Sequence, residues 1–273
     1  MTLVLLAIAA GLLIGLSLGA LGGGGSILAV PVLVYALGQS PVQATTGSLV
    51  VVGVTALIGA AVAVRTGNVL VGRGVVFGLV AVAGAVAGAR ASVGIDEDLL
   101  LAAFGVLMLV VAASMGIRLL RSGRRSTATA PAQLDDPIIT FSPVFACQCP
   151  RALKVLVAAT AVGLLTGFLG VGGGFLVVPA LVLALGLPVR YAAGTSLVVI
   201  TLTSAAALAV RVGSGVQPDW GIVAVLTVVA ALAGAGGSLL AARLDPRRLS
   251  ITFTMLVLLV AVGTAGQAVP ALV

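Results

Sequence analysis

Two stretches of this chain, 148 positions apart, carry the same glycine-rich pattern. Residues 15–31 read GLSLGALGGGGSILAVP and residues 163–179 read GLLTGFLGVGGGFLVVP, so that Pro31 is matched by Pro179 (179 minus 31 is 148). Glycine weakens a helix through its backbone entropy, and proline interrupts one because it lacks an N–H donor. Each stretch therefore predicts a break in an otherwise apolar helix, closed by its proline.

The apolar composition places these breaks in a membrane. Hydrophobic residues make up 61% of the 273-residue chain and charged residues only 8%, whereas a soluble domain has about 25% charged residues. The apolar runs are helical in length, roughly 18 to 24 residues, which is too long for the alternating strands of about 10 residues in an outer-membrane barrel. We therefore predict an all-α fold, a polytopic bundle of transmembrane helices.

The order of the apolar runs is the same in both halves of the chain. In each half, two runs flank the glycine break and form a helical hairpin, and three further runs are expected to span the bilayer. The predicted runs are residues 3–21, 27–37, 42–64, 74–89 and 99–117, then 152–169, 175–187, 191–210, 220–242 and 249–269. The chain thus divides into a first transmembrane repeat (1–118), a cytoplasmic linker (119–150) and a second transmembrane repeat (151–273).

The fourth run carries a second glycine pattern. Residues 84–88 read GAVAG, a spacing of small residues that lets membrane helices approach closely. We assign these two glycines to helix packing.

The charged loops predict how the two halves are oriented. A hairpin returns to the side on which it starts, so each half crosses the membrane an odd number of times and the second repeat is inverted relative to the first. If the arginine-rich linker is cytoplasmic, the basic loops 65–73 and 243–248 are cytoplasmic too, and the acidic loop 90–98 lies outside, as the positive-inside rule requires. We therefore predict a multi-pass protein of the inner (plasma) membrane with both termini extracytoplasmic.

Paired breaks at matching places in two inverted repeats indicate a transport site near the bilayer midplane. A short helix is expected to begin after each break, near Ser26 and near Gly174. A helix N-terminus has free N–H donors and about half a positive charge, so two of them facing each other form an anion site without a buried cation. No charged residue lies well inside an apolar run, and Arg190 and Arg211 stand at run ends.

Hydroxyl residues near the start of the next helix add donors for an oxyanion. Residues 44–49 read ATTGSL and residues 192–197 read AAGTSL. Serine and threonine in membrane helices also commonly bond their own i−4 carbonyl, and glycine-rich loops can be tight helix crossings, so packing is the alternative. The candidate substrate-binding residues are Gly22, Gly24, Gly25, Ser26, Thr45, Thr46, Ser48, Gly172, Gly173, Gly174, Thr195 and Ser196.

The duplicated glycine pattern and the two hydroxyl-bearing helix starts resemble the sulfite exporter TauE/SafE family of bacterial and archaeal membrane permeases. The resemblance covers both halves of the chain. It implies the export or passage of small sulfur-containing anions such as sulfite, sulfoacetate or other organosulfonates. The two copies differ in detail, because Gly23 stands where Val171 does and Ser26 stands where Gly174 does.

The sequence and the resemblance together predict a secondary transporter that exports small sulfur-containing anions. A channel-like anion pathway and a subunit of a larger membrane complex are the alternatives. The expected partners are the anionic substrate and the lipid bilayer; a homo-oligomer is left open, and nucleic acid is not expected, because the arginines lie between apolar runs and not in a basic patch. We expect no cofactor, metal or catalytic residue, since the chain has no histidine, the commonest metal ligand and proton shuttle.

The linker contains the two cysteines of the chain, Cys147 and Cys149. Thiols one residue apart rarely form a disulfide, and the cytoplasm is reducing, so we interpret them as surface or packing residues. A thiol-relay enzyme would depend on them. We expect the double variant Cys147→Ser/Cys149→Ser to keep its anion flux in proteoliposomes, and loss of flux in a folded double variant would favour the enzyme.

Overall fold

The computed structural model describes residues 2–92, 149–169, 174–211 and 217–241, together with a few single positions in 106–113 and 251–255. Every regular element within these residues is a helix, which confirms the predicted all-α class. The predicted runs 99–117 and 249–269 lie outside the described residues apart from those single positions. Almost all of the linker lies outside them as well.

The helices of the two halves follow each other in the same order. The first half contains α1 (Thr2–Leu21), α2 (Gly24–Pro31), the π-helix η1 (Val32–Ala36), α3 (Pro41–Arg65) and α4 (Val71–Ala91). The second half contains α6 (Cys149–Leu169), α7 (Gly174–Ala184), α8 (Val189–Arg211) and α9 (Trp220–Ala241). Among the described helices, α1, α3, α4, α8 and α9 are long and apolar enough to cross a membrane, as expected for a multi-pass membrane protein.

The first predicted break is present, but its proline does not close it. α1 ends at Leu21, Gly22 has a left-handed φ of +68°, and α2 begins at Gly24. Pro31 is the last residue of α2, and the backbone continues from it without interruption into η1. The missing N–H of proline is thus accommodated by a change to the wider π-turns and not by the end of the helix. Pro179 likewise lies inside α7, so the expectation that a proline closes each break is wrong.

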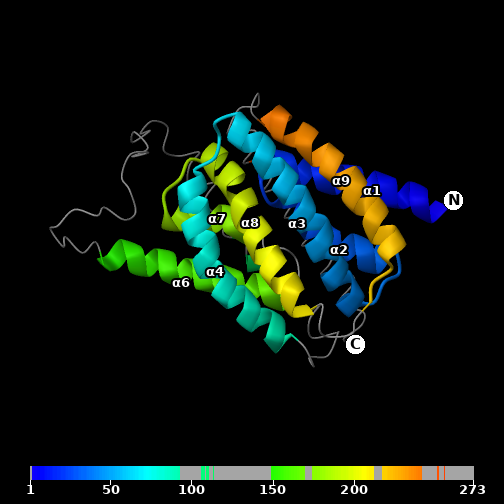
Figure 1. Cartoon of the computed structure of the whole chain (residues 1–273), viewed down its shortest axis with the longest axis horizontal. Helices are drawn as coiled ribbons and strands as arrows, with labels where there is room; N and C mark the ends of the chain where they lie inside the picture. The colour runs from blue at the N-terminus through cyan, green and yellow to red at the C-terminus, as the bar shows by residue number, and fades with distance from the viewer. Residues whose placement is uncertain are drawn as a thin grey trace.

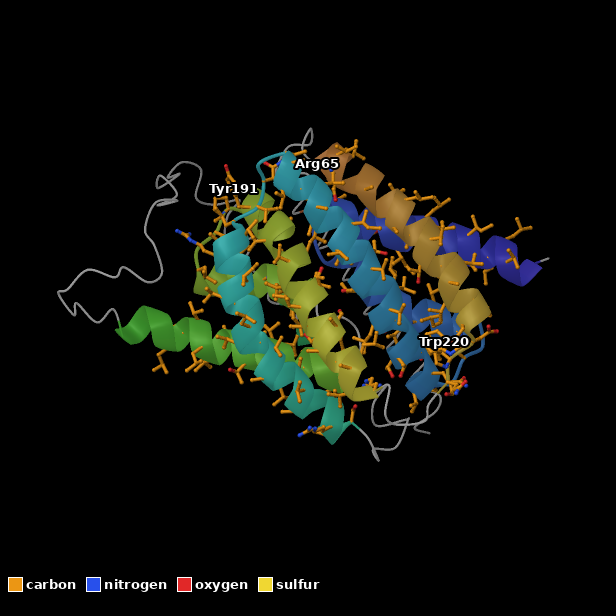
Figure 2. All side chains as sticks on the ribbon, viewed as in Figure 1. Arg65, Tyr191 and Trp220 are labelled. Atoms are coloured by element: carbon orange, nitrogen blue, oxygen red, sulfur yellow. The ribbon has the colours of Figure 1, made fainter. Side chains whose placement is uncertain are left out.

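α3 and α8 form the centre of the bundle, side by side and antiparallel (Figure 1). Near one end, a Cβ added to Gly59 would lie 3.2 Å from Cδ1 of Leu197, and further along the pair Gly53 faces Ser204. Figure 2 shows the two ends of this pair. Arg65 and Tyr191 lie at one end, which we call the Tyr191 end, and Trp220 lies at the other, the Trp220 end.

Two helix pairs flank this centre. α1 packs along α9 on one side and α6 packs along α4 on the other (Figure 1). Backbone approaches at glycine make both crossings close, because an added Cβ would lie between 1.9 and 2.2 Å from a carbonyl oxygen of the facing helix. The glycines concerned are Gly15 and Gly19 of α1 and Gly163 and Gly167 of α6.

The glycines of the GAVAG pattern take part in the same kind of crossing. A Cβ added to Gly84 would lie 2.3 Å from the carbonyl oxygen of Thr160, and one added to Gly88 would lie 2.0 Å from that of Leu164. Both contacts join α4 to α6. The prediction that these glycines serve helix packing is confirmed.

Two neighbouring glycines of α9 offer a matched test of these crossings. A Cβ added to Gly237 would lie 2.6 Å from the carbonyl oxygen of Leu16, whereas one added to Gly236 would meet no atom within 4 Å. We expect Gly237→Ala to lower the free energy of unfolding by about 1 to 3 kcal/mol, as overpacking does. Gly236→Ala should raise it by up to about 1 kcal/mol through helix propensity. Thermal unfolding of both variants in detergent measures the difference, and equal melting temperatures would contradict the tight crossing.

Candidate functional site

The two short helices begin in contact with each other, halfway along α8. A Cβ added to Gly23, the residue before α2, would lie 2.0 Å from the carbonyl oxygen of Gly174, where α7 begins. A Cβ added to Gly174 would lie 2.8 Å from both the Cα of Gly23 and the Cδ1 of Ile200. Ile200 is eleven residues from either end of α8 (Val189–Arg211). The paired helix starts expected from the sequence are therefore neighbours at mid-height in the bundle.

The first break is held in place by the beginning of α8. A Cβ added to Gly22 would lie 2.1 Å from the carbonyl oxygen of Ala193, and the hydroxyl of Ser196 donates a hydrogen bond to the carbonyl oxygen of Gly22. The same hydroxyl lies 2.7 Å from the carbonyl oxygen of Ala193. Since Gly22 also has a left-handed φ, its conformation and the closeness of α8 both require glycine there.

Most of the candidate hydroxyls are bonded to backbone carbonyls. This is the geometry in which a serine or threonine satisfies itself within its own helix. The bonds run from Ser26 to Gly23 (2.7 Å), from Thr45 and Thr46 to Val42 (2.9 and 3.0 Å), and from Ser48 to Thr45 (2.9 Å). In this conformation the hydroxyl hydrogens are engaged, so an anion at the helix starts would depend first on backbone N–H groups of α2 and α7.

Two further candidates face other helices. The hydroxyl of Thr195 accepts a hydrogen bond from the backbone N–H of Leu70 (3.1 Å), immediately before α4, and thus helps to cap that helix. A Cβ added to Gly25 would lie 2.0 Å from the carbonyl oxygen of Ile14, so Gly25 packs against α1. Gly24 is buried as the first residue of α2. Of the remaining candidates, Gly172 and Gly173 lie outside the described residues.

Arg211 corrects the expectation that no cation is buried near these residues. It is the last residue of α8 and only 5% exposed. Its Nη1 donates to the hydroxyl of Thr45 on α3 at 2.8 Å, and its Nη2 donates to the hydroxyl of Ser92 at 2.9 Å. Nη2 also lies 3.2 Å from the carbonyl oxygen of Gly167 and 3.5 Å from that of Phe168, in the last turn of α6.

Sequence reasoning could not distinguish Arg211 from Arg65. Both arginines end an apolar helix that begins with a hydroxyl-rich segment. Arg65 at the end of α3 is exposed, whereas Arg211 at the end of α8 is covered by α3, α4 and α6. Only the packing of those helices decides which of the two charges is buried.

The described residues hold no group of three or more His, Cys, Asp or Glu side chains that could bind a metal ion. The polar groups that meet between α3 and α8 are instead hydroxyls, backbone N–H and carbonyl groups, and one guanidinium. Such a set can hold and orient an oxyanion by hydrogen bonds. It contains no activated nucleophile.

The chain is similar over nearly its whole length to known membrane proteins. A model of the family described as "Sulfite exporter TauE/SafE" matches residues 7–264. A "Probable membrane transporter protein" of Xylella fastidiosa strain 9a5c is 36% identical over 93% of this chain and 92% of its own. A protein of the same name from strain Temecula1 is 35% identical over the same shares. No solved structure matches this chain.

Gly22 and Gly38 form a matched pair for testing the contact of the first break with α8. Both have a φ of +68°, but a Cβ added to Gly38 would meet no atom within 4 Å. Gly38→Ala should therefore cost only the strain of a left-handed residue, about 1 to 2 kcal/mol, and keep transport. Gly22→Ala should lose transport in addition to stability, because Ala193 leaves no room for the added methyl group. Flux and melting temperature are measured on both, and equal flux would show that the contact has no role in transport.

Proposed function

Since the chain belongs to the sulfite exporter TauE/SafE family of membrane transporters, we propose that it is a secondary transporter of small sulfur-containing anions such as sulfite or organosulfonates. The observation that carries this proposal is the contact between the starts of α2 and α7 halfway along α8. The proposed direction of transport is export, as the family description suggests.

The physical basis of the proposed site is the electrostatics of the two helix starts. A helix start carries N–H groups without a partner in its own helix and a partial charge of about +0.5, so two starts at one point attract an anion without a metal ion. At α2 the N–H groups of Gly22 and Ser26 already donate to the carbonyl oxygens of Leu18 and Gly23, so the proposed donors there are the N–H groups of Gly23, Gly24 and Gly25. Gly23 has no side chain that could cap α2 or block its N–H groups. The proposed ligands are the backbone N–H groups of Gly23 to Gly25 and of Gly172 to Gly174, with the hydroxyls of Ser26, Thr46, Ser48, Thr195 and Ser196 joining when they exchange their present partners. The hydroxyl of Thr45, also a candidate from the sequence, instead accepts a hydrogen bond from Arg211 at the Trp220 end.

We further propose that residues 1–118 and 151–273 are two inverted-topology repeats, joined by the linker 119–150. The packing supports this proposal, because each of the following helix contacts has a matching contact between the counterpart helices of the other half. α1 packs on α9 as α6 packs on α4, and α3 packs on α9 as α8 packs on α4, while α3 packs on α8 and α2 on α7. Inverted repeats with broken helices at their interface are a known transporter architecture.

The proposed orientation follows from the charges at the two ends of the bundle. Arg65 and Tyr191, which follows Arg190 in the chain, lie together at the Tyr191 end (Figure 2). Under the positive-inside rule this end faces the cytoplasm, which gives both termini an extracytoplasmic position in the inner membrane. The midpoint of α8, where the helix starts meet, then lies near the middle of the bilayer.

Thermal stabilisation of the purified protein tests the proposed substrate class. A ligand at 100 times its Kd raises the stability by about 2.7 kcal/mol. We expect sulfite or a sulfonate such as sulfoacetate to raise the melting temperature and to be transported in proteoliposomes, with chloride as the reference anion. Absence of both stabilisation and flux with every sulfur anion would reject the proposal and favour a subunit of a larger complex.

A pair of valine variants links this binding to the helix starts. Gly24 is buried at the start of α2, and Gly24→Val should abolish both stabilisation and flux while leaving membrane insertion intact. Gly72→Val is the control, because a Cβ at Gly72 would meet no atom within 4 Å. Normal flux in Gly24→Val would mean that this glycine serves packing at most.

A further inference from the structure

Arg211 connects three neighbouring helices at the Trp220 end of the α3–α8 pair. Arg211 is the last residue of α8, and a buried charge is costly unless hydrogen-bond partners compensate it. Its guanidinium donates to Thr45 on α3, to Ser92 immediately after α4, and to carbonyl oxygens in the last turn of α6. A side chain that only anchored its own helix would not need to reach all three.

Four contacts of the Arg211 guanidinium differ in length. The bonds to the hydroxyls of Thr45 and Ser92, at 2.8 and 2.9 Å, have the usual length of a good hydrogen bond. The contact with the carbonyl oxygen of Gly167, at 3.2 Å, is at the upper end of this range, and the contact with that of Phe168, at 3.5 Å, is beyond it. The two hydroxyls therefore orient the guanidinium. An anionic acceptor, which binds a guanidinium more strongly than a neutral carbonyl does, can replace the two carbonyl contacts.

The equivalent position of the first half of the chain does not carry an arginine. The repeat offset of 148 positions places Ala63 where Arg211 stands (211 minus 148 is 63), and Ala63 is buried. Arg65, two residues further on, is exposed. Among the arginines whose side chains the structure describes, Arg211 is buried, Arg73 at the start of α4 is half-buried, and Arg65 is exposed.

We propose that Arg211 is a specificity-determining residue that binds the oxyanion at the Trp220 end, in exchange for the carbonyl oxygens of Gly167 and Phe168. The planar fork of a guanidinium matches two oxygens of one oxyanion, and charge-assisted bonds are roughly twice as strong as neutral ones. The proposal rests on the proposed anion transport, and it adds a second position for the anion, away from the helix starts near Ile200. Thr45 acts as a positioning residue, because its hydroxyl fixes the guanidinium.

The exchange also has a consequence for α6. Gly167 and Phe168 lie in the last turn of that helix, immediately before the second glycine-rich segment. A cation near the last carbonyls stabilises a helix end. When an anion takes over the guanidinium, this helix end loses part of that stabilisation, so occupancy of Arg211 is coupled to the C-terminal end of α6.

Flux of sulfite into proteoliposomes as a function of its concentration tests this proposal in three arginine variants. Arg211→Gln keeps hydrogen-bond donors but loses the charge, and it should raise KM about tenfold to hundredfold, the usual effect of losing a charge-assisted bond. Arg211→Lys keeps the charge but loses the planar fork of the guanidinium, so its KM should lie between that of the unsubstituted protein and that of Arg211→Gln. Arg65→Gln, the matched arginine at the exposed end of α3, should leave KM within about twofold of the unsubstituted protein.

Thr45→Val provides a second measurement if Arg211→Gln does not fold. It removes the acceptor at 2.8 Å and keeps the charge, and it should raise the KM for sulfite with a smaller change in the maximal rate. Lower melting temperatures with an unchanged KM in the folded Arg211 and Thr45 variants would overturn the proposal and leave Arg211 as a cap of α6. If the unsubstituted protein carries no sulfur anion, the proposed function itself fails, and with it this inference.

Discussion

Glycine lets the helix backbones of this bundle approach each other more closely than any side chain would allow. Apolar side chains gain little by facing each other instead of lipid, so helices in a bilayer associate through close packing and polar contacts. The crossings of α1 with α9 and of α6 with α4 meet this requirement, because glycine lies against the facing carbonyl groups. These crossings flank α3 and α8 (Figure 1), and they fix the direction from which the short helices approach the centre.

The same closeness brings polar backbone into an apolar interior. α2 and α7 begin where Gly23 lies against Gly174, beside the middle of α8. A helix start inside a membrane must have its N–H groups satisfied by protein, water or a ligand. The nearby hydroxyls of Ser26 and Ser196 are bonded to carbonyl oxygens. The proposed anion-binding role therefore falls first to backbone N–H groups, which a side-chain substitution does not remove.

The charges divide the proposed pathway into unequal ends. Arg65 is exposed at the Tyr191 end (Figure 2), and Arg211 is buried at the Trp220 end. If the anion passes the helix starts, it meets the guanidinium of Arg211 at the Trp220 end. Repeats of related sequence can thus give a pathway that binds its substrate differently at its two ends.

The amino-acid sequence alone determined the helical class, the place of the first break, the start of α7 and, to within two residues, the start of α2, which is Gly24 and not Ser26. These features depend on local apolar length and on glycine. The sequence also indicated GAVAG as a packing segment. The prediction that Pro31 closes the first break was wrong, because the helix continues from Pro31 into η1. That continuation depends on how the following turns pack. Only the tertiary structure decided that Ser26 and Thr45 bond to carbonyls, that Thr195 faces α4, and that Arg211 is buried while Arg65 is not. The physical reason is that burial and hydrogen-bond partners depend on which helices pack together. The lengths of the apolar runs and the charges between them do not determine that packing.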